Sequence, residues 1–324
     1  MKKVLVTGAG GFIGGHLVKE LAKSYPTSMI RAVDIKPEQE WHQVVQGADN
    51  RFSADLRLAM YANSSVADVG TIYNLAADMG GMGFIETHKV DCMRSVLINT
   101  HLIEAAASAC CERYFYASSA CVYAADKQCG DDVVYLKESD AYPAAAEDGY
   151  GWEKLFSERM CRHYAEETKM DIRIARFHNV FGPHGAWQGG REKAPAALCR
   201  KIIQAKKNNA SDIEVWGNGE QKRSFMYIDD CLAGITRICS NNIKVPINLG
   251  TSETVTINQL VDIISDIAEH KVERIHNLSA PQGVRSRSSD NTFILERTGW
   301  EPSIPLREGL EKTYRWIEQQ MSND

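Results

Sequence analysis

The first half of the chain alternates between short apolar runs and longer segments suited to helices. KVLVTG (3–8), MIRAVDI (29–35) and RYFYASS (113–119) are rich in apolar residues and have the length of buried strands. The segments 14–24 and 95–109 separate these runs, and we expect both to be helices. The pattern therefore predicts strands and helices in turn.

The same alternation continues as far as residue 177. TIYNLAA (71–77) is expected to be a strand, and the glycine-rich turn DMGGMG (78–83) follows it. A helix from about 149 to 167 precedes a further strand, DIRIARF (171–177). Strands that alternate with helices build βαβ units, so we expect a parallel sheet with helices on both faces.

The second half is richer in loops. Glycine and charged residues fill 182–193, a basic helix is expected at 194–207, and a last helix is expected at about 306–320. The fold class is thus α/β: a Rossmann-like doubly wound parallel sheet with a smaller α/β C-terminal substrate-binding domain at the carboxyl ends of the strands, where open α/β sheets bind ligands. We expect the first domain to take residues 1–178 with parts of about 217–250, and the second to take 179–216 and about 251–324.

Composition and charge narrow the class of protein. With 42 acidic and 37 basic residues the net charge is −5, which argues against a general nucleic-acid binder. No apolar run is long enough to cross a bilayer, and MKKVLVTG reaches glycine too soon for a signal peptide. The nine cysteines include no CxxC pair and no zinc-like spacing with histidine. We expect no metal site, no membrane partner, and a cytoplasmic protein with reduced thiols.

A glycine-rich turn follows the first strand. Gly8, Gly11 and Gly14 would allow a tight turn, close approach of a pyrophosphate, and packing of the next helix on the strand. Asp34 lies twenty residues after Gly14 and would bind the ribose 2′-hydroxyl, which favours NAD over NADP. A purely structural turn is the alternative, because a glycine pattern alone is weak evidence. We expect the first domain to bind NAD, with further contacts from Phe12, Ile13, Asp55, Leu56, Leu75, Ala76 and Ala77; for Asp55, an adenine contact and an exposed loop aspartate are both open.

Tyr150 and Lys154 form a YxxxK pair at the start of a predicted helix. Residues at i and i+4 share a helix face, so the ammonium of Lys154 would lower the pKa of Tyr150 towards neutrality. The phenolate would then take a hydroxyl proton while hydride leaves the same carbon for NAD. YxxxK is common and usually structural, but here it occurs together with a dinucleotide-binding pattern.

Several strings together resemble the extended short-chain dehydrogenase/reductase family of nucleotide-sugar enzymes, the NAD-dependent epimerases and dehydratases. They are TGAGGFIG, NLAA, YASSACVY, YxxxK and RSFMYIDD. The more specific NLAADMGGMGFI, SSACVY, RFHNVFGPHG, GGREKAPAALCRK and GVRSRSSDN are similar to epimerases of that family that act at C3 and C5 of GDP-mannose, over nearly the whole chain. The resemblance implies an NAD-dependent isomerase that forms a homodimer. It also implies that Ser119 completes the triad with Tyr150 and Lys154, and that Cys121 and Lys193 are the acid/base pair.

Chemistry explains why such an enzyme needs Cys121 and Lys193. A ketone at C4 makes the hydrogens on C3 and C5 acidic, and inversion needs two proton-transfer groups on opposite faces of the ring. Burial lowers the pKa of a lysine and neighbouring positive charge lowers that of a cysteine, so both can approach neutrality. The alternatives are a small buried hydrophobe for Cys121 and a solvated loop residue for Lys193.

The resemblance also implies how the nucleotide sugar is held. Guanidinium groups suit a pyrophosphate, and Arg223 and Arg287 match the family positions, although the sequence does not rank Arg287 against Arg285. His178 could be a base, but a satisfied histidine at a strand end is the preferred interpretation. The chain departs from the family pattern at AADKQCGDD (124–132) and at DGYG (148–151). The other expected substrate contacts are Gly80, Ser119, Cys121, Asn179, Glu192, Lys193, Ala194, Lys201 and Gln221; for Lys201 a charged surface is equally open.

The leading hypothesis is epimerisation of GDP-mannose at C3 and C5 through a transient 4-keto sugar, giving GDP-L-galactose and GDP-L-gulose. A 4,6-dehydratase would need an acidic pair after Ser119, where Ala120 and Cys121 stand. The main alternative is a 4-epimerase or a related epimerase of another GDP-hexose or GDP-heptose, which needs only the triad. A non-catalytic NAD-binding protein would be expected to lose Tyr150 or Lys154.

Overall fold

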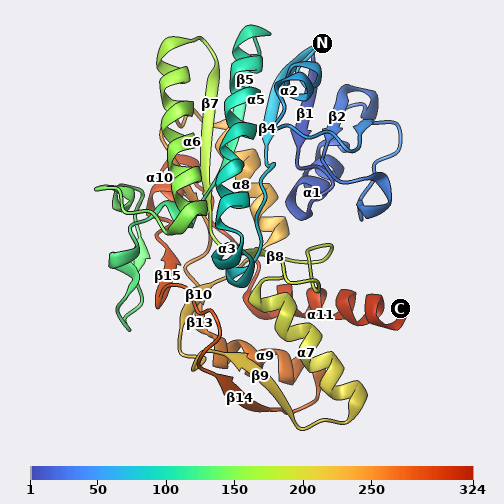
Figure 1. Cartoon of the computed structure of the whole chain (residues 1–324), viewed down its shortest axis with the longest axis vertical. Coiled ribbons are helices and arrows are strands. Elements are labelled where there is room, and N and C mark those ends of the chain that lie inside the picture. The colour runs from blue at the N-terminus through green and yellow to red at the C-terminus, as the bar shows by residue number, and fades with distance from the viewer. Residues whose placement is uncertain (1, 324) are drawn as a thin grey trace.

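A seven-stranded sheet in the order β12-β7-β5-β4-β1-β2-β3 forms the centre of the computed structural model, which describes residues 2–323 (Figure 1). Every neighbouring pair in this sheet is parallel. The predicted doubly wound α/β class is therefore confirmed. The strands are β1 (Lys3–Thr7), β2 (Ile30–Val33), β3 (Asp49–Arg51), β4 (Val69–Asn74), β5 (Arg113–Ser119), β7 (Asp171–Phe177) and β12 (Ile247–Leu249).

The register of this sheet brings the strand ends together. Thr7 pairs with Asn74 at the ends of β1 and β4, and Ser119 pairs with Phe177 at the ends of β5 and β7. Because parallel strands end at one edge, the residues that follow these four meet there. The glycine turn after β1 and the cysteine turn after β5 thus lie at the same edge of the sheet.

Helices cover both faces of the sheet, as two clusters of buried residues show. Val4 and Val6 belong to one cluster and Leu5 to the other, because side chains alternate across a strand. In Figure 1 α5 and α6 run side by side along one face, packed with α2 and α4, and α1 packs with α8. These helices are α1 (Phe12–Leu21), α2 (Ala59–Ser65), α3 (Met82–Thr87), α4 (Lys89–Arg94), α5 (Val96–Ser108), α6 (Asp148–Glu167) and α8 (Ile228–Ser240).

Smaller sheets and further helices lie at the carboxyl ends of the strands, in the lower part of Figure 1. A four-stranded sheet has the order β13-β10-β15-β6, and two-stranded parallel pairs are formed by β9 with β14 and by β8 with β11. The elements are β6 (Tyr135–Leu136), β8 (Val180–Phe181), α7 (Ala194–Asn208), β9 (Asp212–Trp216), β10 (Lys222–Ser224), β11 (Met226–Tyr227), β13 (Thr254–Thr256), α9 (Ile257–Ala268), β14 (Glu273–Asn277), β15 (Ser286–Ser289) and α11 (Leu306–Asn323). In contrast, α10 (Thr292–Thr298) packs against β12 of the central sheet.

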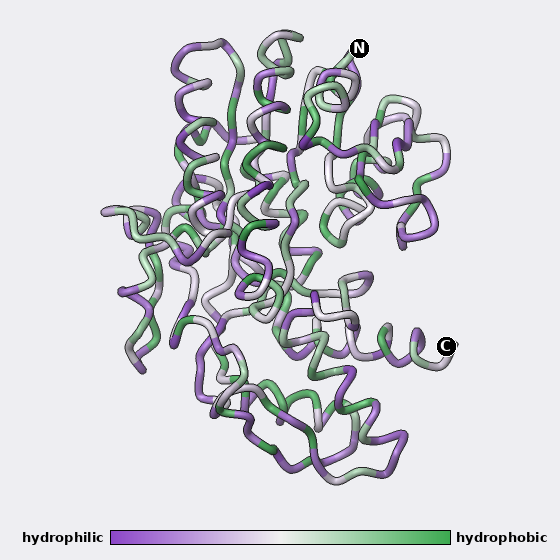
Figure 2. Tube along the Cα trace, viewed as in Figure 1, coloured by the Kyte–Doolittle hydropathy of each residue, from purple (hydrophilic) through white to green (hydrophobic). Residues whose placement is uncertain are grey.

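Segments from the second half return to the central sheet. β12 pairs with β7, and α8 packs beside α1. The exact domain boundaries stay a prediction. Figure 2 shows the apolar residues along the central strands and the inner sides of helices, with hydrophilic residues along the loops below. Of the helices in residues 2–323, none combines the length and apolarity that spanning a membrane requires.

One strand ends earlier than the sequence predicts. The run 71–77 was expected to be a strand, but β4 spans Val69–Asn74. The backbone of Leu75 and Ala76 instead lies against Gly8, where an added Cβ would come within 2.9 Å of the Leu75 carbonyl carbon. The apolar run continues because it packs against the glycine turn after leaving the sheet.

Candidate active site

A cavity of about 290 Å³ opens at the carboxyl edge of the sheet. Its walls come from the ends of β5 and β7, the loop before α3, the start of α7, and strands β9, β10 and β15. The structure thus brings together residues that are far apart in the sequence. All the expected substrate contacts line it: Gly80, Ser119, Cys121, Asn179, Glu192, Lys193, Ala194, Lys201, Gln221, Arg223 and Arg287.

The glycine turn after β1 fits a dinucleotide. Gly8 has φ +70°, which favours glycine, and a Cβ on Gly14 would lie 2.1 Å from the Gly8 oxygen. The backbone N–H of Gly11 donates to that oxygen at 3.0 Å, and α1 begins at Phe12 and Ile13. Only glycines allow this close approach, which leaves the helix N-terminus open to an anion.

Asp34 stands at the edge of this turn. Its carboxylate accepts from the backbone N–H groups of Gly10 at 2.9 Å and Lys36 at 3.0 Å, and each oxygen keeps a lone pair for a ribose hydroxyl. Burial raises its pKa. Asp55, in contrast, holds Arg57 with both oxygens at 2.9 Å, and Leu56 is buried in the core. The Asp55 carboxylate is therefore engaged within the protein.

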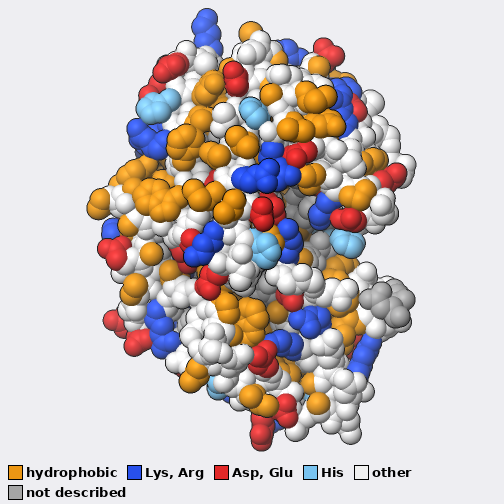
Figure 3. Space-filling model, viewed as in Figure 1, with side chains coloured by type: hydrophobic (Ala, Val, Ile, Leu, Met, Phe, Trp, Pro, Cys, Tyr) orange, Lys and Arg blue, Asp and Glu red, His pale blue; other side chains and the backbone are white. Residues whose placement is uncertain are grey.

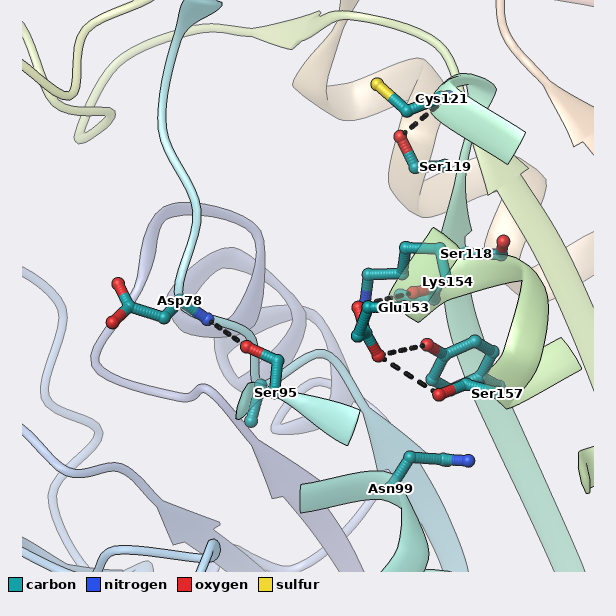
Figure 4. Close-up of polar contacts among 12 residues, drawn as sticks. Asp78, Ser95, Asn99, Ser118, Ser119, Cys121, Glu153, Lys154 and Ser157 are labelled. Carbon is teal, nitrogen blue, oxygen red and sulfur yellow. Dashed lines mark hydrogen bonds and ion pairs between the residues drawn. The ribbon is translucent and has the colours of Figure 1, made fainter. Parts of the chain in front are cut away.

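The hydride-transfer group lies on β5 and α6. Tyr150 and Lys154 are both buried, and the Lys154 ammonium lies 5.7 Å from the centre of the Tyr150 ring. Lys154 donates to the Ala117 carbonyl at 3.1 Å, and Figure 4 shows its side chain beside Glu153. In the same view, the Ser119 hydroxyl points to the backbone N–H of Cys121, from which it accepts at 3.2 Å.

The expected lowering of the Tyr150 pKa is not what the structure gives. Burial raises the pKa of Tyr150, and a hydrogen bond to Ser119 acts in the opposite direction. The Glu153 carboxylate, which lies 3.7 Å from the Lys154 ammonium, also raises the pKa of Tyr150 and so opposes the effect expected of the lysine. In the protein alone, Tyr150 is therefore a protonated phenol.

Cys121 lies in a single 3₁₀ turn, Ala120–Val122, directly after β5. Arg287 donates from Nη1 to its Sγ at 3.4 Å. Burial raises the pKa of the thiol and the Glu147 carboxylate adds to this effect, while Arg287 opposes both. The expectation that nearby positive charge lowers the pKa of Cys121 is thus wrong for the net effect, because the dry site and a neighbouring carboxylate outweigh the guanidinium.

Lys193 lines the same cavity but comes from the start of α7. It is the N-cap of α7 and follows the glycine-rich loop. Burial lowers the pKa of Lys193, as expected, while the charge of Cys121 acts to raise it. Arg191 holds the loop in place by donating to the Asp78 carboxylate at 2.7 Å and to the Met79 carbonyl at 3.1 Å.

The two arginines that the sequence did not rank are separated by the structure. Arg287 is buried and lines the cavity, whereas Arg285 pairs with exposed Asp131 at 2.5 Å and is not among the lining residues. Arg223 also lines the cavity, and burial lowers its pKa to about 10. Arg287 and Arg223 are therefore the predicted diphosphate arginines that line the cavity. Arg200 lines it as well and pairs with Glu192 at 3.0 Å, and Arg223 donates to the carbonyls of Lys222, Gln282 and Val284.

Lys201 and Gln221, which line the cavity beside β9, make some of their hydrogen bonds within the protein. Lys201 donates to the Glu214 carbonyl at 2.8 Å, and Gln221 donates to the Trp216 carbonyl at 3.0 Å. The buried Oε1 of Gln221 has no hydrogen-bond partner among residues 2–323. This oxygen is free to accept from a ligand.

His178 is not placed for catalysis. It is fully buried, shares a hydrogen bond with Asn248 at 3.0 Å, and is not among the residues that line the cavity. Burial lowers its pKa to about 3, which keeps the imidazole neutral. The preferred interpretation, a satisfied histidine at a strand end, holds for Nε2 only, because the buried Nδ1 has no hydrogen-bond partner among residues 2–323.

Sequence reasoning missed Glu147 and Trp216, which both line the cavity. Glu147 pairs with Arg287 at 2.5 Å beside the thiol of Cys121. Its signal was an acidic residue three positions before Tyr150, just ahead of the DGYG departure. Trp216 ends β9 without any comparable signal.

Comparison with known proteins agrees with this geometry. The model of the family described as "NAD dependent epimerase/dehydratase family" matches residues 4–250. The chain is 42% identical over 323 residues to the GDP-mannose 3,5-epimerase of Arabidopsis thaliana, covering 99% of this chain and 84% of that protein. It is 41% identical to GDP-mannose 3,5-epimerase 1 of Oryza sativa subsp. indica, over 99% of this chain and 83% of that one. The resemblance predicted from the sequence is confirmed.

Solved structures give the same fold. The UDP-glucose 4-epimerase of Thermotoga maritima, solved with UDP-glucose, superposes with a TM-score of 0.85 at 21% identity, covering 98% of this chain and 99% of that chain. MoeE5 in complex with UDP-glucuronic acid and NAD superposes with a TM-score of 0.80 at 25% identity, again over 98% and 99% of the two chains. The first of these likenesses supports the fold alone.

Proposed function

The chain belongs to the NAD dependent epimerase/dehydratase family, and from this premise we propose that it epimerises GDP-mannose at C3 and C5. The products are GDP-L-galactose and GDP-L-gulose, and the reaction passes through a transient 4-keto sugar. The relatives named GDP-mannose 3,5-epimerase support this choice because the alignment runs over nearly the whole chain.

One observation carries the proposal. Cys121, from the end of β5, and Lys193, from the start of α7, line the same cavity as Ser119 and Tyr150. A plain C4 redox reaction needs Ser119, Tyr150 and Lys154 but has no use for a second pair of proton-transfer groups. Inversion next to a C4 ketone does need such a pair.

The residues divide the work by position. In the loaded site Tyr150 acts as a phenolate, which the Lys154 ammonium stabilises. It takes the proton of the C4 hydroxyl and becomes a neutral phenol, while Ser119 holds that hydroxyl by a hydrogen bond. The glycine turn and Asp34 would hold NAD, which would supply the hydride acceptor for C4 and the hydride for the final reduction. Tyr150 then returns its proton, so the reaction is redox-neutral overall.

Cys121 and Lys193 carry out the inversion. One removes the proton from C3 or C5 and the other delivers a proton to the opposite face of the ring. Arg223 and Arg287 are the groups that bind the diphosphate, because their guanidinium forks match its oxygens. The buried cavity excludes water, which limits loss of the ketone to side reactions.

The test is incubation with GDP-mannose in deuterated water, followed by NMR. Deuterium at C3 and C5 supports the proposal, whereas inversion at C4 alone, without label, would show a 4-epimerase and sink it. Cys121→Ala should lose both inversions and still bind NAD. The matched control is Cys111→Ala, since Cys111 is a buried thiol in the core behind the sheet and should behave as wild type.

We further propose that the protein is a homodimer. Large apolar side chains stay exposed on α4, α5 and α6, and Figure 3 shows apolar side chains gathered over α5 and α6. Phe156→Glu should shift the protein to a monomer in sedimentation experiments, and an unchanged mass would contradict this. The exposed side chains are Val90, Met93, Leu97, Trp152 and Phe156.

We also infer a cytoplasmic location. The cysteines of the described chain are free, and seven of them are buried within the fold. Thiols in this number fit a reducing compartment. Fractionation of cells that express the protein tests the inference, and recovery outside the cytoplasm would contradict it.

A further inference from the structure

One buried carboxylate beside the reacting groups has no role in the mechanism above. Glu147 is the N-cap residue of α6, three positions before Tyr150, and its side chain is 11% exposed. It lines the cavity together with Cys121. Burying a carboxylate is costly unless it is paired, and the partner of Glu147 is Arg287, which also contacts Cys121.

Glu147 and Cys121 are joined in two ways. The backbone N–H of Glu147 donates to the Cys121 carbonyl at 2.9 Å, and the start of α6 passes so close that a Cβ on Gly151 would lie 2.2 Å from the same oxygen. Through side chains, Arg287 bridges the two: Nη2 donates to the Glu147 carboxylate at 2.5 Å, and Nη1 donates to the Cys121 sulfur at 3.4 Å.

The guanidinium of Arg287 is also fixed from a third direction. Its Nε donates to Oε1 of Gln128 at 2.6 Å, in the loop that follows the cysteine turn. Gln128 and Arg287 are both buried, so their bond is protected from water. Glu147 and Gln128 together hold one edge of the guanidinium and leave the other edge against the sulfur.

Charge balance around the thiol depends on Glu147. Arg287 alone would favour the thiolate, because a cation beside a thiol stabilises its charged form. The Glu147 carboxylate cancels that charge, and burial together with Glu147 raises the pKa of Cys121. The ion pair in turn keeps Glu147 charged, since its pKa is lowered by Arg287 although burial acts to raise it.

Other groups face Cys121 as well. Cys92 belongs to the same small buried cluster as Cys121. The charge of Cys121 acts to raise the pKa of Arg223 on β10 and of Lys193 at the start of α7. These are constant between the variants considered below. The full set of titratable, charged or hydrogen-bonding groups is Cys92 from α4, Ser119 from β5, Glu147 and Tyr150 from α6, Lys193 from α7, Arg223 from β10 and Arg287 from β15.

We propose that Glu147 is a positioning residue for Cys121: it holds the Arg287 guanidinium against the sulfur and cancels its charge, so that the free protein keeps Cys121 as a protonated thiol. The inference rests on the proposed function only in taking Cys121 as a proton-transfer residue. Glu147 itself does not exchange protons with the sugar. It sets the state in which Cys121 meets the substrate.

The test follows the alkylation of Cys121 by iodoacetamide across a pH series, because only the thiolate reacts. Trypsin releases Cys121 as the only cysteine of segment 114–127, so mass spectrometry resolves its rate from the others. In Glu147→Gln the midpoint of the rate–pH curve should fall by about one unit or more, the size of the effect of a nearby charge. An unchanged midpoint would overturn the proposal.

Controls separate this electrostatic role from packing. Asp148→Asn removes the same charge from the adjacent residue, which pairs with exposed Lys89 instead, and its midpoint should match wild type. Exposed Cys129, the only cysteine of segment 128–137, should react identically in all variants. An equal shift in Asp148→Asn and Glu147→Gln would show a general charge effect and overturn the specific role.

A folding defect would be visible in the same digest. Buried Cys199 lies alone in segment 194–200 and reacts only if the chain unfolds. If Glu147→Gln exposes it, Glu147→Asp decides, because the shorter side chain retracts the carboxylate from Arg287 and the midpoint should fall by part of the full shift. A wild-type midpoint in a folded Glu147→Asp would then overturn the proposal.

The alkylation experiment uses no substrate. Its outcome therefore stands whether or not GDP-mannose takes up deuterium at C3 and C5. Label at both carbons with an unchanged Glu147→Gln midpoint would reject the role of Glu147 and keep the proposed function. A shifted midpoint without label would do the reverse.

Discussion

Two glycine-rich turns border the active site, and they use glycine for different reasons. In the turn after β1, a Cβ on Gly14 would lie 2.1 Å from the Gly8 oxygen, so glycine is needed for close packing of backbone on backbone. In the turn before α7, Gly189 and Gly190 have φ of +87° and +85° and open space around the position of a Cβ. There glycine sets the direction of the chain and packs against nothing.

The difference carries over to the groups that each turn serves. The bend of the cofactor turn is set by contacts among its own glycines, and the residues after β4 and β2 pack against the turn once it has formed. The second turn delivers Lys193, and contacts from elsewhere hold it: Arg191 donates to Asp78, its carbonyl accepts from Gly81 at 3.0 Å, and its guanidinium lies 3.8 Å from the centre of the Phe84 ring. The turn before α7 therefore depends on contacts that Arg191 makes with residues 78–84, which are distant in the sequence; we call these contacts the clasp.

The largest effect should come from removing what the second turn delivers. Lys193→Met should lower inversion at C3 and C5 by about 10²–10⁴-fold, the usual contribution of a positioned acid or base. NAD binding should not change, because Lys193 is remote from the glycine turn. NMR of the sugar products and calorimetric titration with NAD measure the two quantities.

The matched control for that variant is Lys207→Met, which removes a lysine from the other end of α7. It should keep wild-type turnover. If Lys193→Met still inverted C3 and C5 at the wild-type rate, the turn before α7 would supply no proton-transfer group, and the two turns would not differ in the way described.

Next in size is the packing defect expected from Gly14→Ala. The added methyl group must push the Gly8 backbone aside, and overpacking of this kind costs about 1–3 kcal/mol of the free energy of unfolding. NAD affinity should fall as well, because the displaced Gly8 backbone belongs to the turn that would meet the pyrophosphate, and a loss of about 1.4 kcal/mol in binding is a factor of ten. Urea unfolding and NAD titration measure both, with Gly130→Ala, where a Cβ meets nothing within 4 Å, as the neutral control.

A smaller effect is expected from opening the clasp. Arg191→Met removes an ion pair that is partly exposed and a contact with an aromatic ring, each worth at most about 1 kcal/mol. Turnover should fall about tenfold, because Lys193 is held less firmly, while NAD affinity stays unchanged. If NAD affinity fell instead of turnover, the clasp would be serving the first turn.

The Arg191 result can be sharpened with Asp78→Asn. If the two side chains act through their ion pair, the double variant should lose no more turnover than Arg191→Met alone. Losses that add would mean that the two residues act separately.

The smallest effect should come from Gly190→Ala. Its positive φ disfavours any residue with a Cβ by about 1 kcal/mol, but no neighbouring atom is displaced. The shift in unfolding free energy should therefore be smaller than in Gly14→Ala, and NAD affinity should be that of wild type. A defect as large as that of Gly14→Ala would show that both turns pack tightly.

Local patterns predicted most of the elements that carry the site. β5 spans the run 113–119, α6 begins one residue before the expected position near 149, and α7 covers the predicted basic helix. Each is specified by its own apolar spacing or its own boundary residues. The helices α8 and α9 are not among the predicted elements, although their buried residues recur at helical spacing.

The candidate site divides in the same way. Ser119, Cys121, Tyr150 and Lys154 stand in short strings whose chemistry is readable from spacing. Lys193 and the binding residues came from family resemblance, and the structure places them at the same cavity. Asp55 shows the limit of spacing, because a neighbour two residues away, Arg57, takes up its carboxylate.

The sequence by itself determined the sheet, the glycine turn and the order of reacting groups along the chain, because these depend on residues within one or two turns of each other. Only the tertiary structure decided that Arg287 rather than Arg285 enters the site, that Glu147 stands beside the thiol, and that burial raises the pKa of both Cys121 and Tyr150. Burial and charge at a point are sums over segments far apart in the chain. They exist only after those segments have packed.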